Sequence, residues 1–118
     1  MFTDINTMKK YMKEYRYVRA TLNKYLEYEK INGLSDTDRS ILDKISDEFL
    51  RKSKVVNLFI ESITDIYIKQ LFCMRYLSGY TWKKISVLMG GVASADCYRN
   101  AVNRYFCKYF ENLNVNKK

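Results

Sequence analysis

The sequence predicts an all-α domain of five or six helices, and three observations support this. The 118 residues include no proline, and the four glycines fall where the apolar periodicity breaks. Proline and glycine are the residues least suited to helix interiors. Apolar residues recur at steps of three and four, the period of a helix buried along one side. We therefore expect a single domain with helix breaks near Gly33, residues 51–53, Gly79 and residues 90–94.

The first predicted helix covers residues 6–32 and ends at Gly33, a residue type favoured just beyond helix ends. Steps of three and four along it define an apolar stripe: Met8, Tyr11, Tyr15, Val18, Leu22 and Tyr25. Such a heptad stripe can line the domain's own core or meet a second copy of the chain. We therefore take the stripe as the candidate surface for a protein partner or a homodimer.

Two further segments complete the N-terminal part, residues 1–62. Ser35 and Asp38 have the spacing of a capping box and predict a second helix that ends near residues 51–52. Ser53 can cap the densely apolar segment 55–63. That segment would also suit a strand, but no second alternating segment could pair with it, so we predict a helix. Thr64–Asp65 either caps a new helix or lies inside one long helix over residues 53–78, and we expect a bend there.

Residues 63–112 predict three helices, of which the last two form a helix-turn-helix. The first of the three spans residues 65–77 and ends at Ser78–Gly79. Thr81 and Ser94 suit the N-caps of the other two, and Gly90–Gly91 separates them. The buried side of the middle helix is expected to carry Trp82, Ile85, Leu88 and Met89, and that of the last helix Tyr98, Val102, Tyr105 and Tyr109. Residues 113–118 are expected to be a disordered tail.

Charge and residue usage limit the functional classes. The net charge is +8, and residues 81–118 hold seven Lys/Arg against two Asp/Glu. A cluster of positive charge favours phosphate binding. The chain has no histidine, which excludes Ser-His-Asp chemistry and histidine-ligated metals. Three cysteines without a C-x-x-C pair suggest a reducing compartment. We expect no enzyme activity, no metal, no cofactor and no membrane span.

A set of motifs in residues 63–110 resembles a known family. R-Y-x-x-G-x-T-W runs from Arg75 to Trp82, Gly90–Gly91 follows, and S-A-D-x-x-R runs from Ser94 to Arg99. The set is similar to the small sigma-70 region 4-like regulators of phages and other mobile elements of Gram-positive bacteria, including late-gene activators of the ArpU/RinA type. The resemblance implies a cytoplasmic, DNA-binding transcriptional regulator with its recognition helix at about residues 95–110 and Ile85 and Leu88 as a core pair.

The helical period assigns roles on the last helix. With its tyrosines and Val102 inward, Arg99, Asn100 and Asn103 point outward. Arginine suits the edge of guanine and asparagine that of adenine, so these three are the candidate base contacts. Phosphates would be bound by surrounding cations and by the amides near the helix start. The candidate phosphate contacts are Lys83, Lys84, Ser94, Arg104 and Lys108.

Two functional hypotheses follow. The favoured one is a sequence-specific transcriptional regulator that binds double-stranded DNA. The alternative is an interaction module that keeps the helix-turn-helix fold but binds RNA polymerase or another regulator through the stripe of residues 8–25. A simple helical hairpin without any ligand has the same pattern, because fold alone does not determine function.

Overall fold

The computed structural model describes residues 4–116, with side chains described up to Glu111. The predicted all-α fold is confirmed for this part of the chain, in which no strand occurs. Five α-helices and one π-helix follow one another: α1 (Ile5–Asn32), α2 (Asp36–Glu61), α3 (Ile66–Phe72), the π-helix η1 (Cys73–Leu77), α4 (Trp82–Leu88) and α5 (Ala95–Asn116). None of these helices is both long enough and apolar enough to cross a bilayer.

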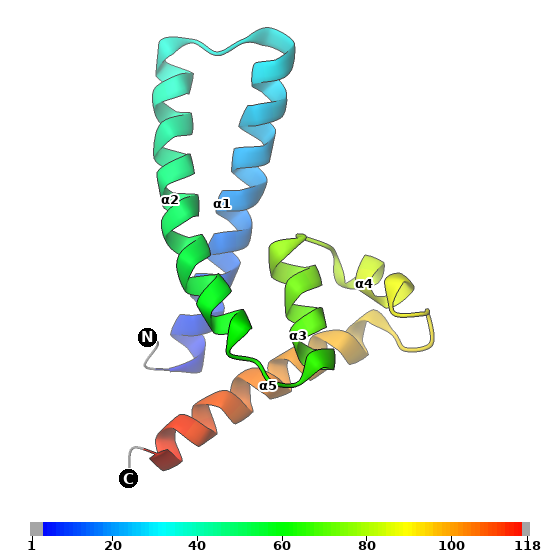
Figure 1. Cartoon of the computed structure of the whole chain (residues 1–118). Coiled ribbons are helices and arrows are strands. Elements are labelled where there is room, and N and C mark those ends of the chain that lie inside the picture. Colours follow the sequence, from blue (N-terminus) through cyan, green and yellow to red (C-terminus); the bar gives the residue numbers. More distant parts are fainter. Residues whose placement is uncertain (1–3, 117–118) are drawn as a thin grey trace.

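The long helices α1 and α2 form an antiparallel hairpin, and α3, α4 and α5 gather at its open end (Figure 1). The closed end at Gly33 extends away from the other helices, so the molecule measures 52 × 39 × 20 Å along its principal axes. We call residues 17–50 the arm. Leu42 is the single buried residue of the arm, because two helices alone cover little of each other's surface.

Side-chain caps fix the helix starts, as the sequence predicts. Ser35 Oγ accepts from the Asp38 amide (3.2 Å), and Thr81 Oγ1 accepts from the Lys84 amide (3.1 Å). Asp65 Oδ1 accepts from the Tyr67 and Ile68 amides, which makes the expected bend the start of a new helix, α3. Each such bond satisfies an N–H group that has no partner within its own helix.

The break predicted at residues 51–53 is wrong, because α2 passes through them without interruption. Lys52, which we interpreted as near a helix end, is only 7% exposed. Its Nζ lies 3.3 Å from Glu14 Oε2, 3.5 Å from Glu48 Oε1 and 4.1 Å from the centroid of the Tyr11 ring. The buried lysine therefore forms a partly exposed charge cluster with these two carboxylates, and the cluster joins α1 to α2.

The helix expected at residues 65–77 changes its winding halfway. After Phe72 the chain adopts a π-helix, and the Ser78 amide donates to the Cys73 carbonyl (2.9 Å). Gly79 then takes a φ of +75°, a conformation that favours glycine, and turns the chain into α4.

The C-terminal helix is longer than we predicted. Helix α5 continues to Asn116, so residues 113–116 are helical where we expected a disordered tail. Residues 117 and 118 lie outside the described part.

The stripe proposed as a partner surface is largely used inside the chain. Met8 and Tyr15 are buried in the main core, and Tyr11 lies under Lys52. Val18, Leu22 and Tyr25 are half-buried along the arm. The helical phase of α1 turns this side toward α2, so the interpretation as a free docking surface is wrong for the buried members.

The core lies where the open end of the hairpin meets α3 and α5, and Phe59 of α2 is at its centre. The Phe59 ring stacks on Phe106 (centroids 6.1 Å apart) and meets the edges of Phe72 (5.6 Å) and Tyr109 (5.2 Å). These rings come from α2, α3 and α5. All five α-helices contribute to the core, whose other members include Met8, Met12, Val56, Leu71, Ile85 and Val102.

Replacing Phe59 with alanine should lower the free energy of unfolding by about 3–5 kcal/mol, because a large buried ring is lost and a cavity remains. Urea denaturation measures the change. The control is Leu58→Ala, since Leu58 is the preceding residue of the same helix and is 59% exposed. Equal losses for the two variants would contradict the central position of Phe59.

Candidate nucleic-acid interface

The turn between α4 and α5 is held by two hydrogen bonds of Ser86, one donated by its hydroxyl and one accepted by its carbonyl. Ser86 Oγ donates to the Ala93 carbonyl (2.5 Å), and the Gly91 amide donates to the Ser86 carbonyl (2.9 Å). Gly90 and Gly91 have φ values of +104° and +69°, which residues with a side chain rarely adopt. Ser94 Oγ then accepts from the Cys97 amide and caps α5 as predicted. This turn fixes the angle at which α5 leaves α4.

The short helix α4 buries fewer of its side chains in the core than we predicted. Ile85 is fully buried, and Trp82 and Met89 are half-buried against the same core. Leu88 is 55% exposed, so its predicted place in the core and in the pair with Ile85 is wrong. At 100° per residue, Leu88 lies about a quarter turn from the centre of the stripe formed by the other three. Its exposure follows from this phase.

The buried side of α5 is rotated relative to the prediction. Tyr98 and Val102 are buried as expected, but Phe106 and Phe110 continue the stripe, while Tyr105 and Tyr109 are only half-buried. Both series have helical spacing, so periodicity alone does not choose between them. Phenylalanine carries no hydroxyl, whereas the tyrosine hydroxyl requires a polar partner or water. The rotation changes which residues face outward.

The three candidate base contacts lie in two environments. Asn100 is exposed near the middle of the open side of α5, together with Arg104 and Lys108. We call these three residues the open strip. Arg99 is exposed at its edge and pairs with Asp96, with Nη2 2.7 Å from Oδ1. Asn103 is half-buried and lines a pocket with Arg99. Asn100 is therefore the most accessible of the three to a ligand outside the chain.

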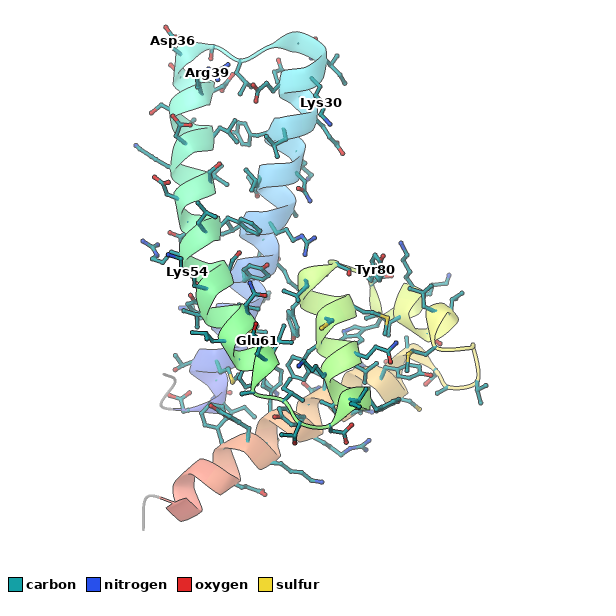
Figure 2. All side chains as sticks on the ribbon, viewed as in Figure 1. Lys30, Asp36, Arg39, Lys54, Glu61 and Tyr80 are labelled. Atoms are coloured by element: carbon teal, nitrogen blue, oxygen red, sulfur yellow. The ribbon has the colours of Figure 1, made fainter. Side chains whose placement is uncertain are left out.

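The other candidate phosphate contacts surround the turn. Lys83 and Lys84 are exposed at the start of α4, and the Lys84 Nζ lies 3.9 Å from the centroid of the Tyr80 ring. Figure 2 labels Tyr80 at the connection that leads into α4, away from the arm. Ser94 is exposed, but its hydroxyl already caps α5. The lysines leave their charge available, whereas Ser94 acts mainly on its own helix.

Four cations that adjoin the candidate interface were not predicted from the sequence. Lys9, Lys13 and Arg16 of α1, with Arg75 of η1, line a pocket of about 260 Å³ together with Arg99 and Asn103. The sequence does contain a signal for the three α1 cations. Steps of four and three place them on one side of a helix. Only the fold brings that side next to α5.

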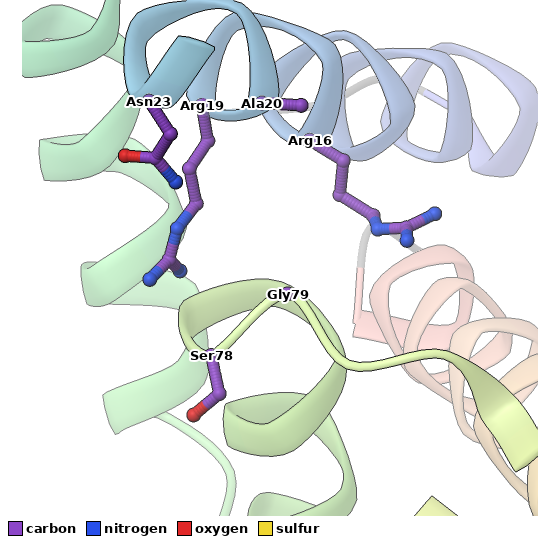
Figure 3. A pocket seen from close by; sticks show the side chains of 6 residues that line it. All are labelled: Arg16, Arg19, Ala20, Asn23, Ser78 and Gly79. Carbon is purple, nitrogen blue, oxygen red and sulfur yellow. The ribbon is translucent and has the colours of Figure 1, made fainter. Parts of the chain in front are cut away.

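The arginines of α1 and η1 also support the turn before α4. Arg19 Nη1 donates to the Tyr76 carbonyl (3.2 Å), and Figure 3 shows Arg19 extending from α1 toward the Ser78 turn. Arg75 Nη1 donates to the Tyr80 carbonyl (3.1 Å), and its guanidinium lies 4.6 Å from the centroid of the Trp82 ring. Burial lowers the pKa of Arg75, and the nearby charge of Arg16 lowers it further. Arg16 and Arg75 therefore lie close enough for their positive charges to interact.

No protein-family model matches the chain, and neither a curated protein nor a solved structure shows significant similarity to it. The thiols of Cys73, Cys97 and Cys107 are free. In residues 4–111 no group of three or more Cys, Asp or Glu side chains has the arrangement of a metal site. The function must therefore be inferred from the residues and their geometry.

Replacing Ser86 with alanine should lower the free energy of unfolding by about 1 kcal/mol, because the Ala93 carbonyl loses its hydroxyl donor. Chemical denaturation measures this loss. Ser40→Ala is the matched control, since Ser40 is an exposed serine inside α2 and the same change there alters only helix propensity. A Ser86→Ala variant as stable as the control would mean that the hydroxyl does not hold the turn.

Proposed function

We propose that the chain is a sequence-specific, DNA-binding transcriptional regulator that places α5 in the major groove. The observation that carries the proposal is the open strip. Asn100, Arg104 and Lys108 lie on the side of α5 that faces away from the core formed by Tyr98, Val102 and Phe106. One side of α5 is thus bound to the fold, and the other offers an amide and two cations to a ligand.

The dimensions and chemistry of the strip suit duplex DNA. The major groove is about 12 Å wide and admits one α-helix. Asn100 has the bidentate amide that pairs with the adenine edge, and Arg104 can reach guanine or a phosphate. Lys83 and Lys84 lie exposed on the preceding helix, where a helix-turn-helix contacts the sugar–phosphate backbone. Base reading and backbone contact are thus divided between the two helices.

The resemblance to sigma-70 region 4-like regulators points to the same function. Its motifs coincide with structural positions: Thr81 caps α4, Gly90 and Gly91 form the turn, and Ser94 caps α5. Within this proposal the chain acts on DNA in a bacterial cytoplasm, as the resemblance implies. The alternative of a pure interaction module is less well supported, because Met8 and Tyr15 of its proposed surface are buried in the core.

The test begins with selection of a preferred duplex from a random pool by the purified chain. Asn100→Ala should then weaken binding to the selected duplex by about 1–3 kcal/mol and binding to a scrambled duplex by clearly less. The reason is that a base contact carries sequence information and a phosphate contact does not. Asn57→Ala is the matched control, because Asn57 is an exposed asparagine on α2.

Two outcomes would contradict the proposal. If no duplex is enriched and none is bound at low salt, the chain does not bind DNA. If Asn100→Ala lowers both affinities by the same factor, Asn100 contacts DNA without reading its sequence, and the proposal loses its central base contact.

Asp96→Asn should increase affinity for both selected and scrambled duplexes. The change frees the Arg99 guanidinium from the ion pair at 2.7 Å and removes a negative charge from the edge of the strip. The slope of log affinity against log salt should steepen by about one, since one more cation becomes available to a phosphate. Titrations at several salt concentrations measure it, with Asp43→Asn on α2 as the control. An unchanged slope would place Asp96 and Arg99 outside the bound surface.

A further inference from the structure

The pocket between α1, η1, α4 and α5 is strongly positively charged. Its described lining includes five cationic residues and no carboxylate. The cations are Lys9, Lys13, Arg16, Arg75 and Arg99, and the rest of the lining is Tyr76, Trp82, Val102, Asn103 and Phe106. A volume of about 260 Å³ has room for a phosphate group with several waters, at ~30 Å³ for each water.

The α1 cations of this pocket have little compensation from the chain itself. In the part of the chain that the structure describes, Lys9, Lys13 and Arg16 form no ion pair. The Nε of Arg16 is buried and has no hydrogen-bond partner among the described residues. A buried donor without a partner is costly, and neighbouring like charges repel. An anion with several oxygens would supply acceptors and reduce the repulsion between Arg16 and Arg75.

The pocket lies beside the open strip of α5. Arg99 and Asn103 line it, and they precede Asn100 and Arg104 by a single residue each. Successive residues are 100° apart around a helix, so the pocket borders the strip along one edge. When α5 lies in a major groove, the sugar–phosphate backbone at the edge of that groove runs past the same residues.

We infer that this pocket binds a phosphodiester of the DNA backbone, so that the first half of α1 is part of the DNA-binding surface. The inference rests on the proposed function and extends it from the helix-turn-helix to a third element. A free phosphorylated small molecule carries the same oxyanion chemistry, and the experiment separates the two sources.

The first measurement is duplex affinity as a function of salt for Lys13→Ala and Lys10→Ala. Both lysines are exposed on α1, but only Lys13 lines the pocket. Lys13→Ala should reduce the salt slope by about one, to the same extent on selected and scrambled duplexes. Lys10→Ala should leave the slope unchanged. Equal effects of the two variants would mean diffuse attraction and would overturn the inference.

The second measurement uses Trp82, which lines the pocket and is the chain's single tryptophan. Its fluorescence is followed during titration with duplex and, separately, with inorganic pyrophosphate. Binding of the backbone should change the emission of wild type, and Lys13→Ala should weaken that response. A response to pyrophosphate at low concentration with none to bound duplex would assign the pocket to a free phosphorylated molecule and overturn the inference.

The two proposals fail in different ways. A wild-type chain that binds no duplex refutes the proposed function. A chain that binds duplex with the same salt slope in wild type and Lys13→Ala refutes only the assignment of the pocket. Circular dichroism of each variant confirms that an altered slope does not come from unfolding.

Discussion

The packing of aromatic rings around Phe59 joins the two parts of the chain, and the placement of every candidate site residue depends on it. Phe59 belongs to the hairpin, whereas Phe72 and Phe106 belong to α3 and α5. Aromatic pairs contribute about 0.5–1.5 kcal/mol each beyond the area they bury. Stacked and edge-on contacts also restrict orientation. The rings therefore set the angle of α5 relative to α1, and with it the width of the basic pocket between them.

Features that depend on neighbouring residues could be predicted from the sequence. The caps at Ser35, Thr81 and Ser94 each involve a side chain and an amide three residues further on. The glycine turns are equally local. The break expected at residues 51–53 does not occur, because α2 continues through Lys52, which pairs with Glu14, 38 positions earlier in the chain. No local pattern shows that a lysine in the middle of a helix has such a distant partner.

The same distinction applies to the candidate interface. Asn100, Arg104 and Lys108 were found because helical spacing alone places them on one side of α5. The sequence does not determine the phase of that helix, since a series through Tyr105 and one through Phe106 have the same period. Arg16 and Arg75 were missed because they come together only when α1 packs beside η1. A binding surface shared by distant segments leaves no single motif in the sequence.

The thin arm has a consequence for local stability. Leu42 is its one buried residue, whereas Val56, Phe59 and Ile60 of α2 and Ile63, just after α2, are buried in the core. Segments with few buried contacts open at a free energy well below that of global unfolding. Amide hydrogens near Gly33 should thus exchange with solvent through local fraying, and those near Phe59 only when the whole domain unfolds. The tip can bend or unwind while the helices that carry the open strip and the basic pocket keep their arrangement.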